Sequence, residues 1–103
     1  MQVNQAIPAE ADVYLALKYR IVVDKAGRRL CLNHNGDPHC EDGPAIVWAN
    51  GTKEWYQNGL HHREDGPAVE FPSGMHKWCL NGIIFSQQRY YKRLAELGIA
   101  NDH

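Results

Sequence analysis

The chain has 103 residues, of which 44% are hydrophobic and 22% are charged, and its formal net charge is -1. This composition is typical of a folded globular domain and excludes an intrinsically disordered chain. A charge so close to zero also argues against a surface-wide positive field that would attract nucleic acid or anionic lipid. The length predicts one domain over residues 1–103, with a modest core.

No apolar run approaches the roughly 18 residues that a membrane-spanning helix needs. Residues 1–8 have neither the positive start nor the apolar centre of a secretory signal. The three cysteines, Cys31, Cys40 and Cys79, are an odd number, which favours free thiols over a disulfide framework. We therefore expect a cytosolic protein with no membrane partner.

Residues 1–12 are polar and contain alanine and proline, which predicts a loosely held tail. Two patterns then conflict. Apolar residues alternate strictly from Val13 to Val23, as in a half-buried strand. Residues 9–18 could instead form a short helix with Pro8 in its first turn. We expect a strand from about Tyr19, and residues 9–18 stay open between helix and strand.

Three segments then have the form of a hairpin, with an apolar run, a polar turn and a second apolar run. They cover residues 21–32, 45–56 and 68–80, and each turn contains a glycine. The second turn, Asn50-Gly51, is the strongest short hairpin signal that a sequence offers.

The connections between these hairpins repeat. Residues 35–45 return 23 residues later as residues 58–68, with an identical Glu-Asp-Gly-Pro-Ala string, and Asn-Gly recurs at 81–82. Such a period over residues 19–82 predicts a mainly β (α+β) fold, an antiparallel meander of about three repeated hairpins and about six strands. Equivalent positions are expected to form the core-facing stripe: Leu32, Trp55, Trp78, Ile46, Val69, Trp48 and Phe71.

Helix signals begin where the repeat stops. Ser86 is a suitable N-cap, Tyr90, Leu94 and Leu97 fall on one helical face, and Gly98 can end the helix. We expect a C-terminal helix over residues 86–98 that covers the last strand or one face of the sheet.

The order Trp55-Tyr56-Gln57-Asn58-Gly59, followed by residues 62–68, resembles MORN-type repeats, and more narrowly the MORN-variant repeats of small bacterial and bacteriophage proteins. The similarity covers about residues 21–82. The first unit departs from it at Asn33-His34 and at Cys40. The resemblance implies successive β-hairpins and a role in binding, with no catalytic residue set and no cofactor.

Three clusters could carry chemistry. His39, Cys40, His61 and His62 offer zinc-ligating atoms, but their spacing matches no zinc-finger arrangement, so we expect structural turn histidines and no metal. The Glu-Asp pairs at 41–42 and 64–65 could act as an acid and a base, yet aspartate before Gly-Pro is typical of a turn. Cys40 lacks the third group of a cysteine nucleophile. We therefore expect no enzymatic activity.

Two sets of residues could bind a partner. Arg89, Lys92 and Arg93 lie among tyrosines, a composition that suits nucleic acid or an acidic protein. A flat sheet would also expose whichever of Trp48, Tyr56 and Phe71 does not point into the core, and exposed aromatic residues often anchor protein partners.

These observations lead us to expect a non-enzymatic protein-binding module. By analogy with the resemblance, it would be a phage or prophage accessory protein that docks on a host protein complex and inhibits it, for example as an anti-CRISPR. Two alternatives stay open. The chain could bind nucleic acid through the basic C-terminal helix, or it could self-associate through its sheet edges as a structural repeat protein.

Overall fold

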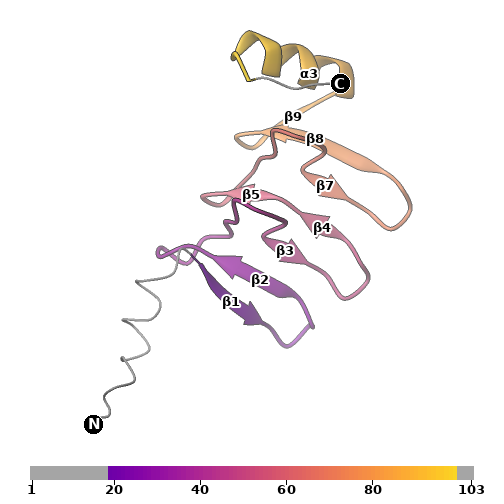
Figure 1. Ribbon diagram of the computed structural model, residues 1–103. Helices are drawn as coiled ribbons and strands as arrows, with labels where there is room; N and C mark the ends of the chain where they lie inside the picture. The colour runs from indigo at the N-terminus through magenta and orange to yellow at the C-terminus, as the bar shows by residue number, and fades with distance from the viewer. Residues whose placement is uncertain (1–18, 100–103) are drawn as a thin grey trace.

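The structure is a computed structural model that describes residues 19–99. Nine strands are followed by one C-terminal helix, so the fold is the predicted mainly β meander (Figure 1). The predicted tail, and the choice between helix and strand over residues 9–18, lie outside the described residues. The strand expected from about Tyr19 begins at Arg20.

Seven strands form one antiparallel sheet in the order β1-β2-β3-β4-β7-β8-β9, and β5 pairs with β6 alone. Figure 1 shows the hairpins side by side from β1 to β9, with α3 beyond them. The strands are β1 (Arg20–Val23), β2 (Arg29–Leu32), β3 (Ile46–Val47), β4 (Lys53–Glu54), β5 (Tyr56–Gln57), β6 (Leu60–His61), β7 (Val69–Glu70), β8 (His76–Leu80) and β9 (Ile83–Phe85).

The strand number exceeds six because two of the connections are hairpins themselves. Asn58 and Gly59 have φ of 51° and 83°, and Asn81 and Gly82 have φ of 50° and 82°. Left-handed backbone at both central residues is what a type I′ turn requires, and this turn matches the twist of the strands it joins. Asn58-Gly59 therefore closes the short hairpin β5–β6, and Asn81-Gly82 closes β8–β9 at the end of the sheet.

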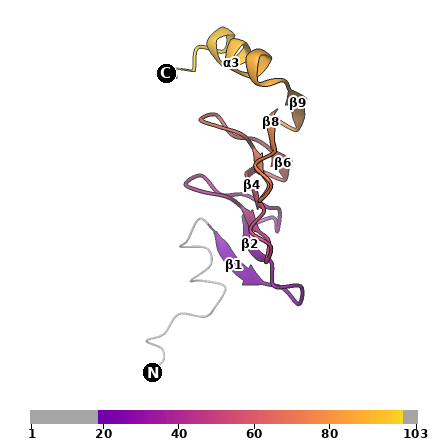
Figure 2. The same cartoon turned by 90° about the vertical axis from the view of Figure 1, so that its right-hand side faces the viewer.

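The strand register assigns the side chains to two faces of a single layer (Figure 2). Successive side chains of a strand point to opposite faces. Residues that are paired across six strands therefore share one face, and the residues next to them in each strand share the other. We call the first side the Glu54 face, and its row is Val22, Leu30, Ile46, Glu54, Val69 and Lys77. The second is the helix face, and its row is Val23, Arg29, Val47, Lys53, Glu70 and His76.

Helix α3 (Gln87–Glu96) begins at the predicted N-cap, where the Ser86 side chain accepts the Arg89 N–H. At the other end Gly98 is left-handed, with φ of 76°. The N–H groups of Gly98 and Ile99 bond back to the carbonyls of Ala95 and Leu94 at 3.1 and 3.0 Å, which is a Schellman cap. The predicted cap residues are therefore confirmed at both ends.

The helix docks on the helix face through two side chains. Tyr90 and Leu94 are buried against Leu80, and Trp78 and Phe85 pack around them. Leu97, which the helical pattern placed on the same face, is 48% exposed because it is the C-cap residue, where the chain leaves the helix.

The buried stripe between units consists mostly of small residues. The predicted Ile46 and Val69 are buried, but Trp48 is 37% exposed, so its place in the core was wrong. The reason is that the sheet is a single layer: Trp48 lies on the Glu54 face, whereas α3 packs on the helix face. The buried apolar residues are Cys31, Ala45, Ile46, Ala68, Val69, Cys79, Leu80, Tyr90 and Leu94.

Successive units are joined by a repeated set of three hydrogen bonds, which we call the junction. In the second junction, the His62 Nδ1 accepts the Asn81 N–H at 2.9 Å. The His61 carbonyl accepts the Gly82 N–H at 2.8 Å, and the Arg63 N–H donates to the Cys79 carbonyl at 3.2 Å.

The first junction makes the same bonds 23 residues earlier. The His39 Nδ1 accepts the Asn58 N–H at 2.8 Å, and the Pro38 carbonyl accepts the Gly59 N–H at 2.9 Å. The Cys40 N–H points to Tyr56 O at 3.3 Å. The sequence repeat is thus a repeat of backbone bonding between neighbours.

Candidate functional site

The Glu54 face carries a groove of about 410 Å³, which we call the aromatic groove. Trp48 and Phe71 follow β3 and β7 at equivalent positions of two units, and both line it. Its other lining residues are Asn50, Thr52, Glu54, His61, Val69, Lys77, Cys79 and Ile84. The fold therefore brings together two of the three aromatic residues predicted to bind a partner.

Glu54 organises the polar floor of this groove. Its carboxylate accepts hydrogen bonds from the Trp48 Nε1–H, from the Tyr56 hydroxyl at 3.1 Å and from the His61 Nε2 at 2.7 Å. Burial opposes ionisation of this carboxyl, but the three bonds outweigh burial and lower its pKa. An ionised Glu54 thus holds the Trp48 ring in place.

Tyr56, the third predicted aromatic residue, supports the groove from beside it. Its ring stacks on His61 with centroids 4.2 Å apart, and its hydroxyl donates to Glu54. Burial, followed by the negative charge of Glu54, raises the pKa of Tyr56 to about 12. The hydroxyl therefore stays protonated and remains a donor.

We expect stability to fall in acid through Glu54. Its pKa is lower in the folded chain than in the unfolded chain, so the unfolded chain binds more protons between the two values. Stability therefore rises with pH in this window and is lost as pH falls through the folded pKa. Thermal melts from about pH 6 to about pH 3 should show a steeper loss for the wild type than for Glu54→Gln. Parallel curves would contradict this role.

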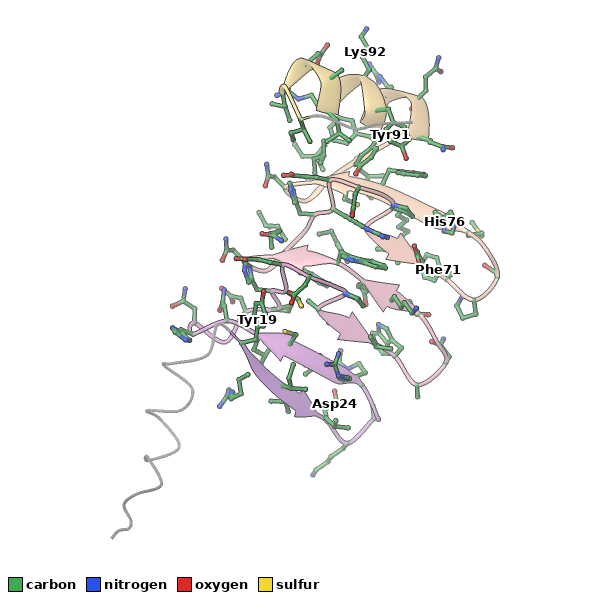
Figure 3. All side chains as sticks on the ribbon, in the orientation of Figure 1. Tyr19, Asp24, Phe71, His76, Tyr91 and Lys92 are labelled. Atoms are coloured by element: carbon green, nitrogen blue, oxygen red, sulfur yellow. The ribbon has the colours of Figure 1, made fainter. Side chains whose placement is uncertain are left out.

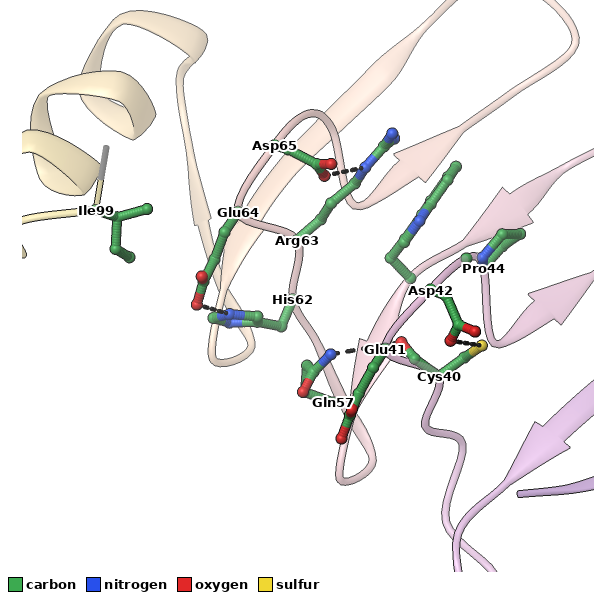
Figure 4. Close-up of a pocket in the computed structure, with 12 residues that line it drawn as sticks. Cys40, Glu41, Asp42, Pro44, Gln57, His62, Arg63, Glu64, Asp65 and Ile99 are labelled. Carbon is green, nitrogen blue, oxygen red and sulfur yellow. Dashed lines mark hydrogen bonds and ion pairs between the residues drawn. The ribbon is translucent and has the colours of Figure 1, made fainter. Parts of the chain in front are cut away.

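A second groove, of about 700 Å³, lies between the two Glu-Asp-Gly-Pro strings (Figure 4). Its charged groups bond to one another. Glu64 Oε2 lies 2.8 Å from His62 Nε2, and Asp65 Oδ1 lies 3.0 Å from Arg63 Nε. Both carboxylates are thus paired with side chains of their own connection.

The four candidate zinc ligands do not converge. His39 and His62 turn their Nδ1 lone pairs to backbone N–H groups of the next unit. His61 faces Glu54 on the opposite side of the sheet, and the Cys40 Sγ lies 3.8 Å from Asp42. Within residues 19–99, no group of three or more His, Cys, Asp or Glu side chains is placed to hold a metal ion.

Arg63 is a structural residue that the sequence analysis did not single out. Its guanidinium lies 3.8 Å from the centre of the Trp55 ring, and its Nη1 bonds Glu70 Oε2 at 3.0 Å. The available signal was the first unit, which has Cys40 in place of Arg63 and Leu32 in place of Trp55. Trp55 and Arg63 are thus present together in the second unit and absent together from the first, which fits their contact.

The same glycine-to-alanine substitution should have different effects in the two identical Glu-Asp-Gly-Pro-Ala strings, because the surroundings of Gly43 and Gly66 differ. A Cβ at Gly66 would lie 2.9 Å from Arg63 Cζ, whereas a Cβ at Gly43 would have nothing within 4 Å. We expect Gly66→Ala to push the guanidinium off Trp55 and cost about 1 kcal/mol. Gly43→Ala, the matched control, should be neutral or slightly stabilising. Urea unfolding measures both, and equal effects would contradict the stacking role.

The basic residues of the helix lie apart from the aromatic groove. Arg89, Lys92 and Arg93 line a third groove, of about 410 Å³, between α3 and the edge strand β9. Arg93 pairs with Glu96 at 3.3 Å. Lys92 lies on the outer side of the helix, at the rim of this groove (Figure 3).

No protein-family model, curated protein or solved structure matches this chain. No helix within residues 19–99 has the length and apolar character needed to cross a membrane.

Proposed function

We propose that this chain is a non-enzymatic, MORN-like protein-binding module that docks on a host protein complex and inhibits it. The sharpest form is a phage or prophage accessory protein with an anti-defence role, such as an anti-CRISPR, acting in the cytoplasm of a bacterial host. The observation that carries the proposal is the aromatic groove, where Trp48 and Phe71 lie partly exposed on the face that α3 does not cover.

The chemistry of the groove supports protein docking. Partly exposed aromatic rings are frequent anchors at protein interfaces, where they bury much area at little entropic cost. The Trp48 Nε1–H is already bonded to Glu54, so a partner can cover the ring without leaving a buried donor unsatisfied. The groove therefore favours an apolar side chain of a partner.

Affinity capture from a bacterial lysate tests this function. Tagged wild-type protein should retain one dominant partner, and Trp48→Ala and Phe71→Ala should each weaken its capture at least about tenfold, as expected for anchor residues. Met75→Ala is the matched control, since Met75 is 71% exposed and lies outside the groove. Tyr56→Ala should act indirectly, by loosening Glu54.

Circular dichroism must first show that each variant is folded. A partner that folded Trp48→Ala and Phe71→Ala variants capture as well as the wild type would place docking elsewhere. Capture of no partner by the wild type would overturn the proposal.

A further inference from the structure

The outer edge of β9 carries backbone groups that are equivalent, one period later, to those that bond at a junction. The residues 23 positions after His61 and Arg63 are Ile84 and Ser86. In the second junction the His61 carbonyl accepts an N–H, and the Arg63 N–H donates to a carbonyl of the next unit. β9 is the last strand of the sheet, so no further unit follows it within residues 19–99.

The β8–β9 hairpin turns these groups outward. Its two-residue turn makes Leu80 and Ile83 a hydrogen-bonded pair, so the next pair, Cys79 and Ile84, is not hydrogen-bonded. The N–H and C=O of Ile84 therefore point away from β8. An edge of this kind is a template for another strand. Ile83 and Ile84 beside it are 61% and 65% exposed, which provides apolar contact area.

The groove above this edge is cationic. It is lined by Arg89, Lys92 and Arg93 and by one carboxylate, that of Glu96. Arg93 pairs with that carboxylate, while Arg89 and Lys92 make no ion pair within the described part of the chain. Charge complementarity therefore favours an acidic occupant.

We propose that β9 and α3 together bind an extended, acidic segment of a protein partner. The segment adds as a strand to the outer edge of β9, donates an N–H to the Ile84 carbonyl and places carboxylates under Arg89 and Lys92. Main-chain bonds of this kind supply affinity, and the flanking side chains supply specificity. This contact shares Ile84 with the aromatic groove but not Trp48 or Phe71, and Arg89 and Lys92 lie outside that groove. Variants of the two pairs of residues therefore test the two contacts separately.

A second copy of this chain fits the edge less well. The equivalent turn of its first unit is Asn35-Gly36, and the donors of that turn are used internally. The Gly36 N–H bonds the Asn33 carbonyl at 3.0 Å, and the Asn35 N–H bonds the Asn33 Oδ1 at 2.9 Å. Nucleic acid would use the cations but leave Ile83 and the strand edge without a partner.

Two synthetic peptides of about ten residues test the proposal by fluorescence anisotropy on the full chain at low salt. One alternates valine with glutamate, and the other alternates valine with lysine. The acidic peptide should bind at least about tenfold more tightly than the basic one. N-methylation of alternate peptide nitrogens should weaken binding by a similar factor, because the N–H that bonds the Ile84 carbonyl is lost.

Charge reversal on the helix locates the contact. Arg89→Glu with Lys92→Glu should weaken binding of the acidic peptide at least about tenfold. The fold should persist, because a glutamate at position 89 falls in the first helical turn, where Ser86 and the helix dipole favour it. Lys53→Glu, an exposed lysine on β4, is the matched control and should bind as the wild type does. Lys92→Glu alone provides a milder variant.

Four outcomes would overturn the proposal. The first is no binding of the acidic peptide, and the second is binding of that peptide by the charge-reversed variants as tightly as by the wild type. The third is no effect of N-methylation. The fourth is displacement of the peptide by a single-stranded oligonucleotide of the same net charge. The last outcome would assign the cationic groove to nucleic acid.

Discussion

Replacing Tyr90 with alanine is expected to release helix α3 and to lower the free energy of unfolding by about 3–5 kcal/mol. Tyr90 is fully buried, and its ring lies 5.0 Å from Trp78 and 5.1 Å from Tyr91, centre to centre. Its hydroxyl donates to the Arg63 carbonyl and accepts the Gly66 N–H. The variant therefore loses both apolar packing and a contact with the second connection.

Two further variants separate these contributions. Tyr90→Phe keeps the ring but leaves the Arg63 carbonyl and the Gly66 N–H without this partner, at a cost of about 1–3 kcal/mol. Lys92→Ala is the exposed control on the same helix and should stay within about 0.5 kcal/mol of the wild type. Urea unfolding followed by tryptophan fluorescence gives all three values. A Tyr90→Ala variant as stable as Lys92→Ala would show that the helix is not part of the cooperative fold.

Removing both junction histidines is expected to have the second largest effect on stability. His39→Ala and His62→Ala should each cost about 1–2 kcal/mol, because each removes the acceptor of a backbone N–H in the next unit. The two junctions use different residues, so the double variant should cost about 2–4 kcal/mol. A small domain would then melt roughly 10 °C or more below the wild type.

Asparagine at the same positions distinguishes the hydrogen bond from simple loss of volume. The Oδ1 of asparagine can take the place of the histidine Nδ1 as acceptor, so His62→Asn should recover part of the stability that His62→Ala loses. His76→Ala, an exposed histidine of β8, serves as the control. If His62→Asn and His62→Ala melt at the same temperature, the Nδ1 bond does not stabilise the junction.

Local chemistry in the sequence was sufficient to predict much of the fold. Asn58-Gly59 and Asn81-Gly82 adopt the left-handed turns that this dipeptide favours, and Ser86 caps the helix as its position indicated. The burial of the aromatic residues was less predictable. Hydrophobicity alone does not say whether a tryptophan points into the core, and Trp48 lies on a face of a single-layer sheet.

The candidate site shows the same division. Trp48 and Phe71 were predicted as binding residues, and the fold places both at one groove. Glu54 was not singled out, because its importance depends on three donors that the pairing of β3 with β4 and of β5 with β6 brings to it. The sequence also did not show whether Tyr56 faces a partner or supports the floor of the aromatic groove, because this depends on its stacking with His61.

The repeat, its Asn-Gly turns and the helix caps could be predicted from the sequence alone, because each of these depends on residues close together in the chain. Only the tertiary structure showed that histidine Nδ1 atoms join the connections to the next unit, and that tyrosines at the two ends of the described chain hold them. Tyr19 binds the first connection through the Glu41 N–H, and Tyr90 binds the second. These tyrosines share no position in the period, since they come from opposite ends of the described chain, and only stacking of the units brings each to its connection.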